Sequence, residues 1–172
     1  MRLISFTPAL LAAVRADRKT VTRRRIASPL SLQQQPDAYR YHGLEQEGAL
    51  FESLQPGSTR WLPLISCPFG QPGALLCVQE DASLRLEVVS LHAEQVRTLT
   101  NTDALAEGVQ ERQLAGQQQW GGVEPDPSLP GCYRWYESPT AAFRALLDSI
   151  YSAAWERNEW VWVVKFTRVL PV

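Results

Sequence analysis

The chain has 172 residues, 45% of them hydrophobic, so it can bury one sizeable core, and we expect a single domain covering residues 1–172. A formal net charge of -1 argues against a protein that coats nucleic acid with its whole surface. Three widely spaced cysteines and two histidines, with no CxxC or HExxH motif, indicate neither a disulfide framework nor a metal site, so we expect no metal and no cofactor.

No stretch of the sequence has the length and hydrophobicity of a membrane span, and the amino terminus lacks the charged, apolar and small-residue zones of a secretory signal. We therefore expect a cytoplasmic protein that has no membrane partner. The sequence leaves the oligomeric state open.

The first elements lead into a cluster of positive charge. The segment 3–6 (Leu-Ile-Ser-Phe) predicts a short strand, and Thr7 before Pro8 predicts the start of a helix with one apolar face. That helix should end near Asp17, and the β-branched residues at 20–22 should be extended. Six of the 17 basic residues lie between positions 15 and 25, against one acid, so the segment should attract anions.

Lys19 lies in the middle of this cluster, and the chain has only one other lysine, Lys165. A lysine can lose its proton when cations crowd it, which arginine in practice cannot do, so the choice of lysine here is a chemical signal. The alternative interpretation is a solvated basic turn in a protein that prefers arginine.

The middle of the chain predicts one irregular segment, two strands and one short helix. The composition of residues 29–59 turns to Gln, Pro, Gly and Ser without periodicity, which predicts a long loop. Residues 74–79 and the alternating segment 84–88 predict strands. Thr100 and Asp103 resemble a capping box, and Gly108 should end the helix that they begin. Glu107 would lie on the last helical turn, where the carbonyl groups repel a carboxylate, and this mismatch favours a functional reason for the acid.

The remaining elements are a second irregular segment, a helix and a strand. Residues 110–137 are rich in Gln, Gly and Pro and predict a second long loop. The helix should start at Ser138-Pro139 and bury Phe143, Leu146, Leu147 and Ile150. The dense segment 160–166 predicts a strand at the centre of a sheet. Short strands with separate helices predict an α+β domain built on a small, strongly bent sheet or barrel.

Several of these segments together resemble the ASCH domain family. They are the opening Ile4-Ser5-Phe6, the segment 18–22 (Arg-Lys-Thr-Val-Thr), the turn 67–73 (Cys-Pro-Phe-Gly-Gln-Pro-Gly) and the helix end 104–108 (Ala-Leu-Ala-Glu-Gly). The Trp-rich segment 158–164 is similar to the carboxyl-terminal strand of the longer, phage-associated branch of the family. The resemblance spans most of the chain and leaves the two predicted loops uncovered.

ASCH domains are similar to PUA domains, so the resemblance implies a PUA-like pseudo-barrel of short mixed strands with flanking helices and two long loop insertions. Small bacterial members are amidohydrolases that remove the acetyl group from N4-acetylcytidine without a metal. Their lysine, threonine and glutamate match Lys19, Thr22 and Glu107 here. The implied partner is therefore a modified cytidine nucleoside or an RNA segment.

The resemblance also has departures. After the turn, the branch commonly carries an acid, then Trp and Arg along the next strand, where this chain has Ala74, Cys77 and Gln79. Glu80 is retained and is a candidate substrate-binding residue. Arg24 is a candidate to hold the oxyanion or a substrate phosphate, and Phe6 or a tryptophan to stack on the pyrimidine.

Amide hydrolysis needs a nucleophile, a base and a group that stabilises the oxyanion. In one mechanism Thr22 attacks, Lys19 is its base, and Glu107 orients groups or supplies a proton. In the other, Lys19 and Glu107 activate water and Thr22 only donates a hydrogen bond. Two rival functions stay open as well: an RNA- or nucleotide-binding module without catalysis, and an ASCH-type ribonuclease.

Overall fold

A computed structural model describes residues 2–27, 29–46 and 48–169. The structure does not describe residues 1, 28, 47 and 170–172. Both ends of the predicted domain, and position 47 of the first predicted loop, therefore lie outside the described residues. The chain forms two compact units. Unit 1 comprises Met1–Ser5, Thr22–Thr98 and Glu156–Val172, and unit 2 comprises Phe6–Val21 and Leu99–Trp155.

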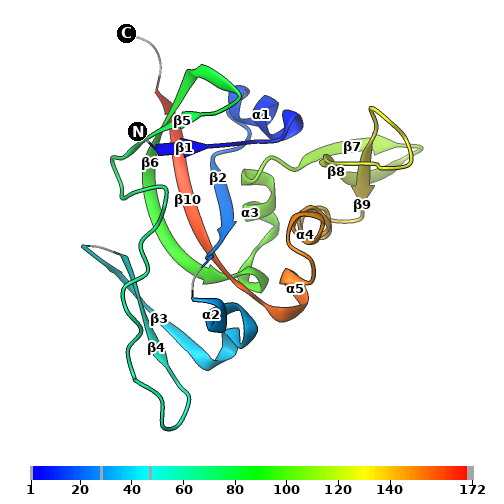
Figure 1. The fold of residues 1–172 in the computed structure, drawn as a ribbon. Helices are drawn as coiled ribbons and strands as arrows, with labels where there is room; N and C mark the ends of the chain where they lie inside the picture. Colours follow the sequence, from blue (N-terminus) through cyan, green and yellow to red (C-terminus); the bar gives the residue numbers. More distant parts are fainter. Residues whose placement is uncertain (1, 28, 47, 170–172) are drawn as a thin grey trace. The chain divides into compact units, whose positions relative to one another are not determined.

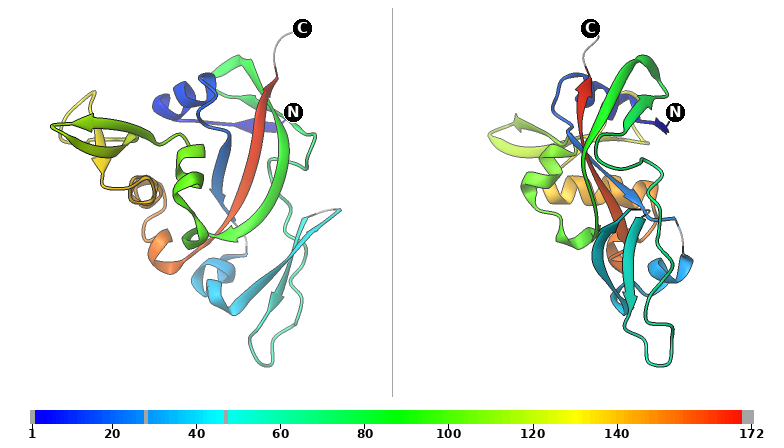
Figure 2. Two further views of the ribbon diagram at one scale, coloured as in Figure 1. Left: turned by 180° about the vertical axis from the view of Figure 1, so that it is seen from behind. Right: turned by 90° about the vertical axis from the view of Figure 1, so that its left-hand side faces the viewer.

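Unit 1 is built on a five-stranded mixed sheet with the strand order β1-β5-β6-β10-β2. The strands are β1 (Arg2–Ile4), β5 (Leu75–Val78), β6 (Asp81–Gln95), β10 (Trp160–Val169) and β2 (Val21–Arg25). β1 is parallel to β5, whereas β6 is antiparallel to both β5 and β10. The long strands β6 and β10 curve along their length, so that the sheet curls into a half-barrel (Figures 1 and 2).

Hydrophobic alternation explains this sheet. In β6 the side chains of Leu84, Leu86 and Val88 are buried, while the intervening Arg85 and Glu87 are exposed, which confirms the predicted half-buried strand. The first five residues of β10 are all buried, as expected for a strand that is covered on both faces. β10 was predicted at the centre of the sheet; it is an interior strand, but β6 is the central one.

The segment 29–59 is not the irregular loop that its composition predicts. It contains α2 (Leu30–Gln34), a 3-10 turn and the antiparallel hairpin of β3 (Tyr39–Glu45) and β4 (Gly48–Ser53). The hairpin is ordered by a few large side chains among many polar ones. The rings of Tyr41, Phe51 and Trp160 pack against one another, with centroids 5.0–6.5 Å apart.

Unit 2 combines helices with a smaller sheet. Its helices are α1 (Pro8–Arg15), α3 (Asn101–Ala106) and α4 (Pro139–Ile150), and α5 (Ala154–Arg157) crosses into unit 1. An antiparallel sheet of β7 (Gln110–Leu114), β8 (Gln117–Pro125) and β9 (Tyr133–Tyr136) has the order β7-β8-β9. α4 packs against β8, β9 and α3. The prediction of a long loop at 110–137 is therefore wrong for most of that segment.

The predicted helices are present, with two differences. Thr7 precedes α1, but its side chain makes no capping hydrogen bond, and Ile150 at the end of α4 is 54% exposed rather than buried. The α+β class with a curled mixed sheet is confirmed. Within the part of the chain that the structure describes, none of the helices has the length and apolar character needed to cross a membrane.

Candidate active site

A tight turn after α1 places Lys19 inside unit 2. Asp17 adopts a left-handed backbone conformation (φ 55°), and the N–H groups of Arg18 and Lys19 both donate to the carbonyl of Ala13. The N–H of Thr20 then donates to the carbonyl of Ala106 at the end of α3. As a result the basic segment turns back against a helix end. Lys19 is 2% exposed and is among the largest fully buried side chains of the protein.

The Lys19 ammonium is surrounded by oxygen. Its Nζ lies 2.6 Å from Glu107 Oε2, 3.0 Å from the Glu107 carbonyl oxygen and 2.8 Å from the Val21 carbonyl oxygen. The three N–H groups of an ammonium therefore have three acceptors. The ring of Phe6 lies on the same amine, with its centroid 5.9 Å from Nζ.

Glu107 is placed by the two ends of α3. The Thr100 side chain accepts from the N–H of Asp103, and the Asp103 carboxylate accepts from the N–H of Thr100, which confirms the predicted capping box. Glu107 is the C-cap, followed by Gly108 in a left-handed conformation (φ 106°). The helix end thus directs a carbonyl and a carboxylate at one ammonium, which offsets the repulsion between that carboxylate and the helix carbonyls.

The ion pair of Lys19 and Glu107 is almost completely removed from solvent. The two side chains are 1% and 4% exposed. Taking both charges out of water costs several kcal/mol per ion, and one hydrogen-bonded pair recovers this only with close geometry. Removing either partner would leave the charge of the other buried without its counter-ion.

Thr22 and Arg24 lie in unit 1, on β2. Arg24 donates from Nε to Thr22 Oγ1 (3.2 Å) and from Nη2 to the carbonyl of Ser5 (2.5 Å). Thr22 is 3% exposed. The residue before it in the chain, Val21, supplies one of the carbonyl acceptors of Lys19.

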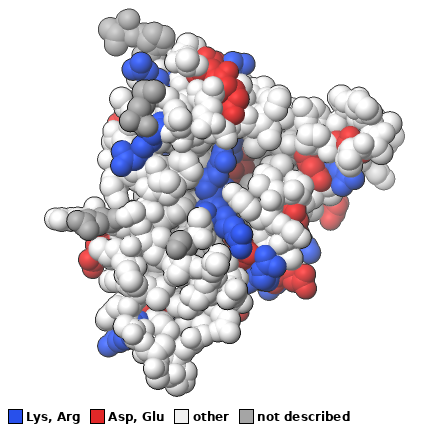
Figure 3. All heavy atoms as spheres, in the orientation of Figure 1, with Lys and Arg blue, Asp and Glu red and all other residues white. Residues whose placement is uncertain are grey.

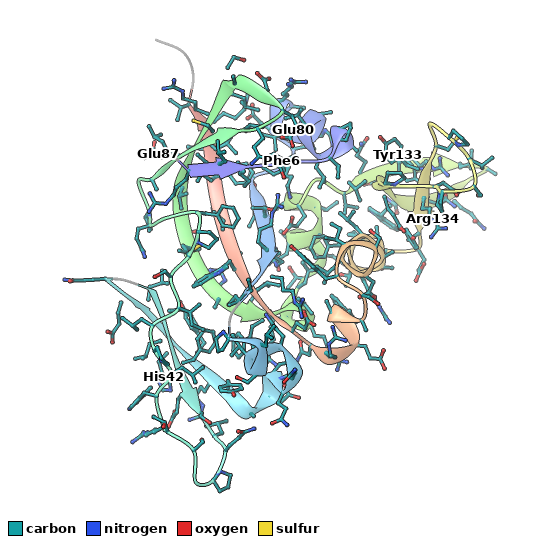
Figure 4. All side chains as sticks on the ribbon, viewed as in Figure 1. Phe6, His42, Glu80, Glu87, Tyr133 and Arg134 are labelled. Carbon is teal, nitrogen blue, oxygen red and sulfur yellow. The ribbon has the colours of Figure 1, made fainter. Side chains whose placement is uncertain are left out.

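The third substrate-binding candidate, Glu80, is exposed in the turn between β5 and β6 (Figure 4). Of the six predicted site residues, the structure brings together Lys19, Glu107 and Phe6 within unit 2. Thr22 and Arg24 are paired with each other in unit 1.

Other arginines of the basic segment are held by acids that the sequence did not single out. Arg23 Nε lies 2.8 Å from Glu94 Oε1. Burial raises the pKa of Glu94, but the hydrogen bond from His92 and the charge of Arg23 lower it by more, so the pKa of Glu94 lies below its usual value. Arg25 pairs with the fully buried Glu159, which also binds Arg157. Lys and Arg side chains nevertheless form a band on the face drawn in Figure 3, near β2.

Sequence reasoning did not identify the backbone acceptors of Lys19, the carbonyls of Val21 and Glu107, because no residue type marks a carbonyl that faces a side chain. Among the residues that the structure describes, no group of three or more His, Cys, Asp and Glu side chains is placed to hold a metal ion. Searches of known family models, curated proteins and solved structures found nothing that matches this chain.

Proposed function

We propose that the protein is an ASCH-type, PUA-like amidohydrolase that removes the acyl group from N4-acylated cytosine nucleosides, with Lys19, Thr22 and Glu107 as its catalytic residues and without a metal. The observation that carries the proposal is the buried pair of Lys19 and Glu107, an amine and a carboxyl group 2.6 Å apart on segments 88 residues apart in sequence. Buried titratable pairs of this kind are enriched at catalytic sites.

The pair supplies both an acid and a base once its proton moves. Transfer of one proton from Lys19 Nζ to Glu107 Oε2 leaves an amine with a lone pair and a carboxylic acid that can donate. The amine takes the proton of the attacking hydroxyl, and the acid protonates N4 as the bond between N4 and the acyl carbon breaks. After each cycle the two groups return to the ion pair.

In the first variant of the mechanism, Thr22 Oγ1 attacks the acyl carbon and forms an ester, which water then hydrolyses to release acetate. Arg24, which donates to Thr22 Oγ1, orients this hydroxyl. In the second variant, water attacks directly and Thr22 donates a hydrogen bond to the substrate. The two variants make different predictions for a threonine that is replaced by valine.

A second candidate function, a nucleotide-binding module without catalysis, is favoured by one observation. Lys19 Nζ already has three acceptors, two of them backbone carbonyls, which is the environment of an ammonium that holds structure rather than one that exchanges protons. Such a protein would bind the nucleoside or RNA and release it unchanged.

The experiment that decides is incubation of the purified protein with N4-acetylcytidine, followed by chromatography of cytidine and assay of acetate, with and without EDTA. The proposal expects turnover that EDTA leaves unchanged. Lys19→Met and Glu107→Gln should each lower kcat by about 10²- to 10⁴-fold. Lys165→Met, which replaces the exposed lysine of β10, is the matched control and should keep full turnover.

Thr22→Val and Thr22→Ser together distinguish the two mechanisms. If Thr22→Val loses turnover while Thr22→Ser keeps it, the result supports nucleophilic attack by the hydroxyl. If both variants keep turnover, the result supports attack by water. Absence of cytidine release by the wild-type protein would overturn the enzyme proposal. Retention of the intact nucleoside would then support the binding module, and fragments of an added RNA would support a ribonuclease.

A further inference from the structure

A groove lies in unit 2 along the sheet of β7, β8 and β9, in the segment to which the sequence assigned no function. Two hollows of about 350 and 440 Å³ both include Tyr133 and Trp135 in their walls. The first is completed by the outer side of α1 and by Gln110, and the second by Arg112, Gln119 and Arg134. Tyr133 and Arg134 are labelled on β9 in Figure 4.

Strand register explains why the aromatic and polar side chains share one face. Arg112 on β7 pairs with Gln119 on β8, and Gly121, two residues further, pairs with Trp135 on β9. Residues paired across strands point to the same side of a sheet. A Cβ on Gly121 would lie 2.1 Å from the Arg134 carbonyl oxygen, so glycine is needed for β8 to approach β9 at this point.

The guanidinium of Arg112 is fixed in place but keeps donors for a ligand. It lies 4.1 Å from the centroid of Trp135, and its Nε donates to Gln119 Oε1 at 3.0 Å. Among the described residues, no carboxylate lies within ion-pair distance of Arg112, so its terminal nitrogens remain available to an anion.

The other charges of the groove are already engaged. Arg134 lies 3.4 Å from Glu124, which also accepts from the Tyr136 hydroxyl at 2.5 Å. Burial and the neighbouring Glu124 raise the pKa of Tyr136 to about 12, so this hydroxyl stays protonated and donates. Asp126 accepts from the N–H and hydroxyl of Ser128. Arg112 is therefore the cation that the groove offers to a ligand.

We propose that this groove binds an unpaired nucleotide of a single-stranded nucleic acid. The base stacks on the rings of Trp135 and Tyr133, the phosphate binds the terminal nitrogens of Arg112, and the Gln110 amide offers hydrogen bonds to the edge of the base. Aromatic rings beside an oriented arginine are the combination that single-stranded nucleic acids require. This site goes beyond the proposed function and does not depend on it.

The test is fluorescence anisotropy with a fluorescein-labelled single-stranded uridine 12-mer, which carries no acyl group. We expect Arg112→Gln to weaken binding about tenfold and to reduce the slope of log K against log salt by about one. Trp135→Leu should weaken binding about tenfold through lost stacking. Arg144→Gln is the matched control, because Arg144 also lies on a tryptophan of unit 2, Trp155, but outside the groove.

The proposal is overturned if Arg112→Gln and Arg144→Gln bind alike, if Trp135→Leu binds as wild type does, or if an acidic dodecapeptide competes as well as the RNA. Should a groove variant fail to fold, titration of the wild-type protein with the 12-mer still decides, because the indole N–H resonance of Trp135 must shift. Hydrolysis of N4-acetylcytidine by Arg112→Gln is a separate readout, so failure of either proposal leaves the other intact.

Discussion

Lys19 and Glu107 were predicted from the sequence as site residues, but their burial and close pairing could not be predicted from it. Each is an ordinary surface residue type, yet together they are buried with Nζ and Oε2 2.6 Å apart. The free-energy cost of burying either charge depends strongly on the presence of the other, because a single charge would be unpaired in a low-dielectric interior. A single variant of either residue should consequently lower the stability of the protein as well as any turnover.

This dependence predicts that Glu107→Gln lowers the free energy of unfolding by about 3 kcal/mol, since it leaves the Lys19 charge buried and unpaired. Denaturation in urea at pH 7 measures the loss. The double variant Lys19→Met with Glu107→Leu should recover most of it, because the interior then holds neither charge. Lys165→Met should change the free energy by less than about 0.5 kcal/mol. Equal losses in the single and double variants would contradict the argument.

At the scale of elements, the end of α3 positions the pair. The capping box fixes where the helix begins, and Gly108 lets the chain leave it immediately after Glu107. A Cβ on Gly108 would lie 3.0 Å from the Cβ of Ala13 and 3.4 Å from that of Lys19. The glycine is therefore where α3, α1 and the lysine approach one another within unit 2.

We predict that Gly108→Ala destabilises the protein by about 2 kcal/mol, from a left-handed alanine and from contact with Ala13. It should also displace Lys19 and lower any turnover that depends on the pair. Gly116→Ala is the control: Gly116 has φ 78° but nothing within 4 Å of the added Cβ, so only the conformational cost applies. Thermal unfolding of both variants gives the comparison, and a loss for Gly108→Ala no larger than for Gly116→Ala would refute the proposed contact.

At the scale of the whole molecule, the chain divides into two units: unit 1 holds the five-stranded sheet and the hairpin of β3 and β4, and unit 2 holds the sheet of β7, β8 and β9. In unit 1 the interior strand β10 has hydrogen-bonded neighbours on both sides, β6 and β2, and its first five residues are buried. The backbone amides of these residues become accessible to solvent only when most of the unit unfolds.

Hydrogen exchange should therefore be slowest in β10 between Val161 and Val164. The five-residue helix α2 should exchange far faster, because helices of this length are not stable by themselves. Exchange followed by mass spectrometry of peptides from both segments measures the difference. Similar rates in the two segments would show that the sheet is not the most stable part of unit 1.

The sequence by itself determined the elements whose pattern is local. The alternation of β6, the capping box at Thr100 and the apolar face of α4 are each recorded within a few consecutive residues, and each was predicted. The segments 29–59 and 110–137 were misread as loops because their strands carry many polar residues and show no clear apolar alternation. Their order comes from packing partners outside these segments, such as Trp160 for the hairpin of β3 and β4, and α4 for β8 and β9.

For the candidate site, the sequence supplied the residue types at positions 19, 22 and 107, through local motifs and a family resemblance. Only the tertiary structure decided that Lys19 and Glu107 are both removed from solvent, with Nζ and Oε2 at hydrogen-bonding distance. Only the tertiary structure, likewise, decided that Arg112 packs on Trp135 and has no carboxylate partner in the described part of the chain. The physical reason is that helix caps and strand alternation depend on neighbours along the chain, whereas desolvation and charge pairing depend on neighbours in space.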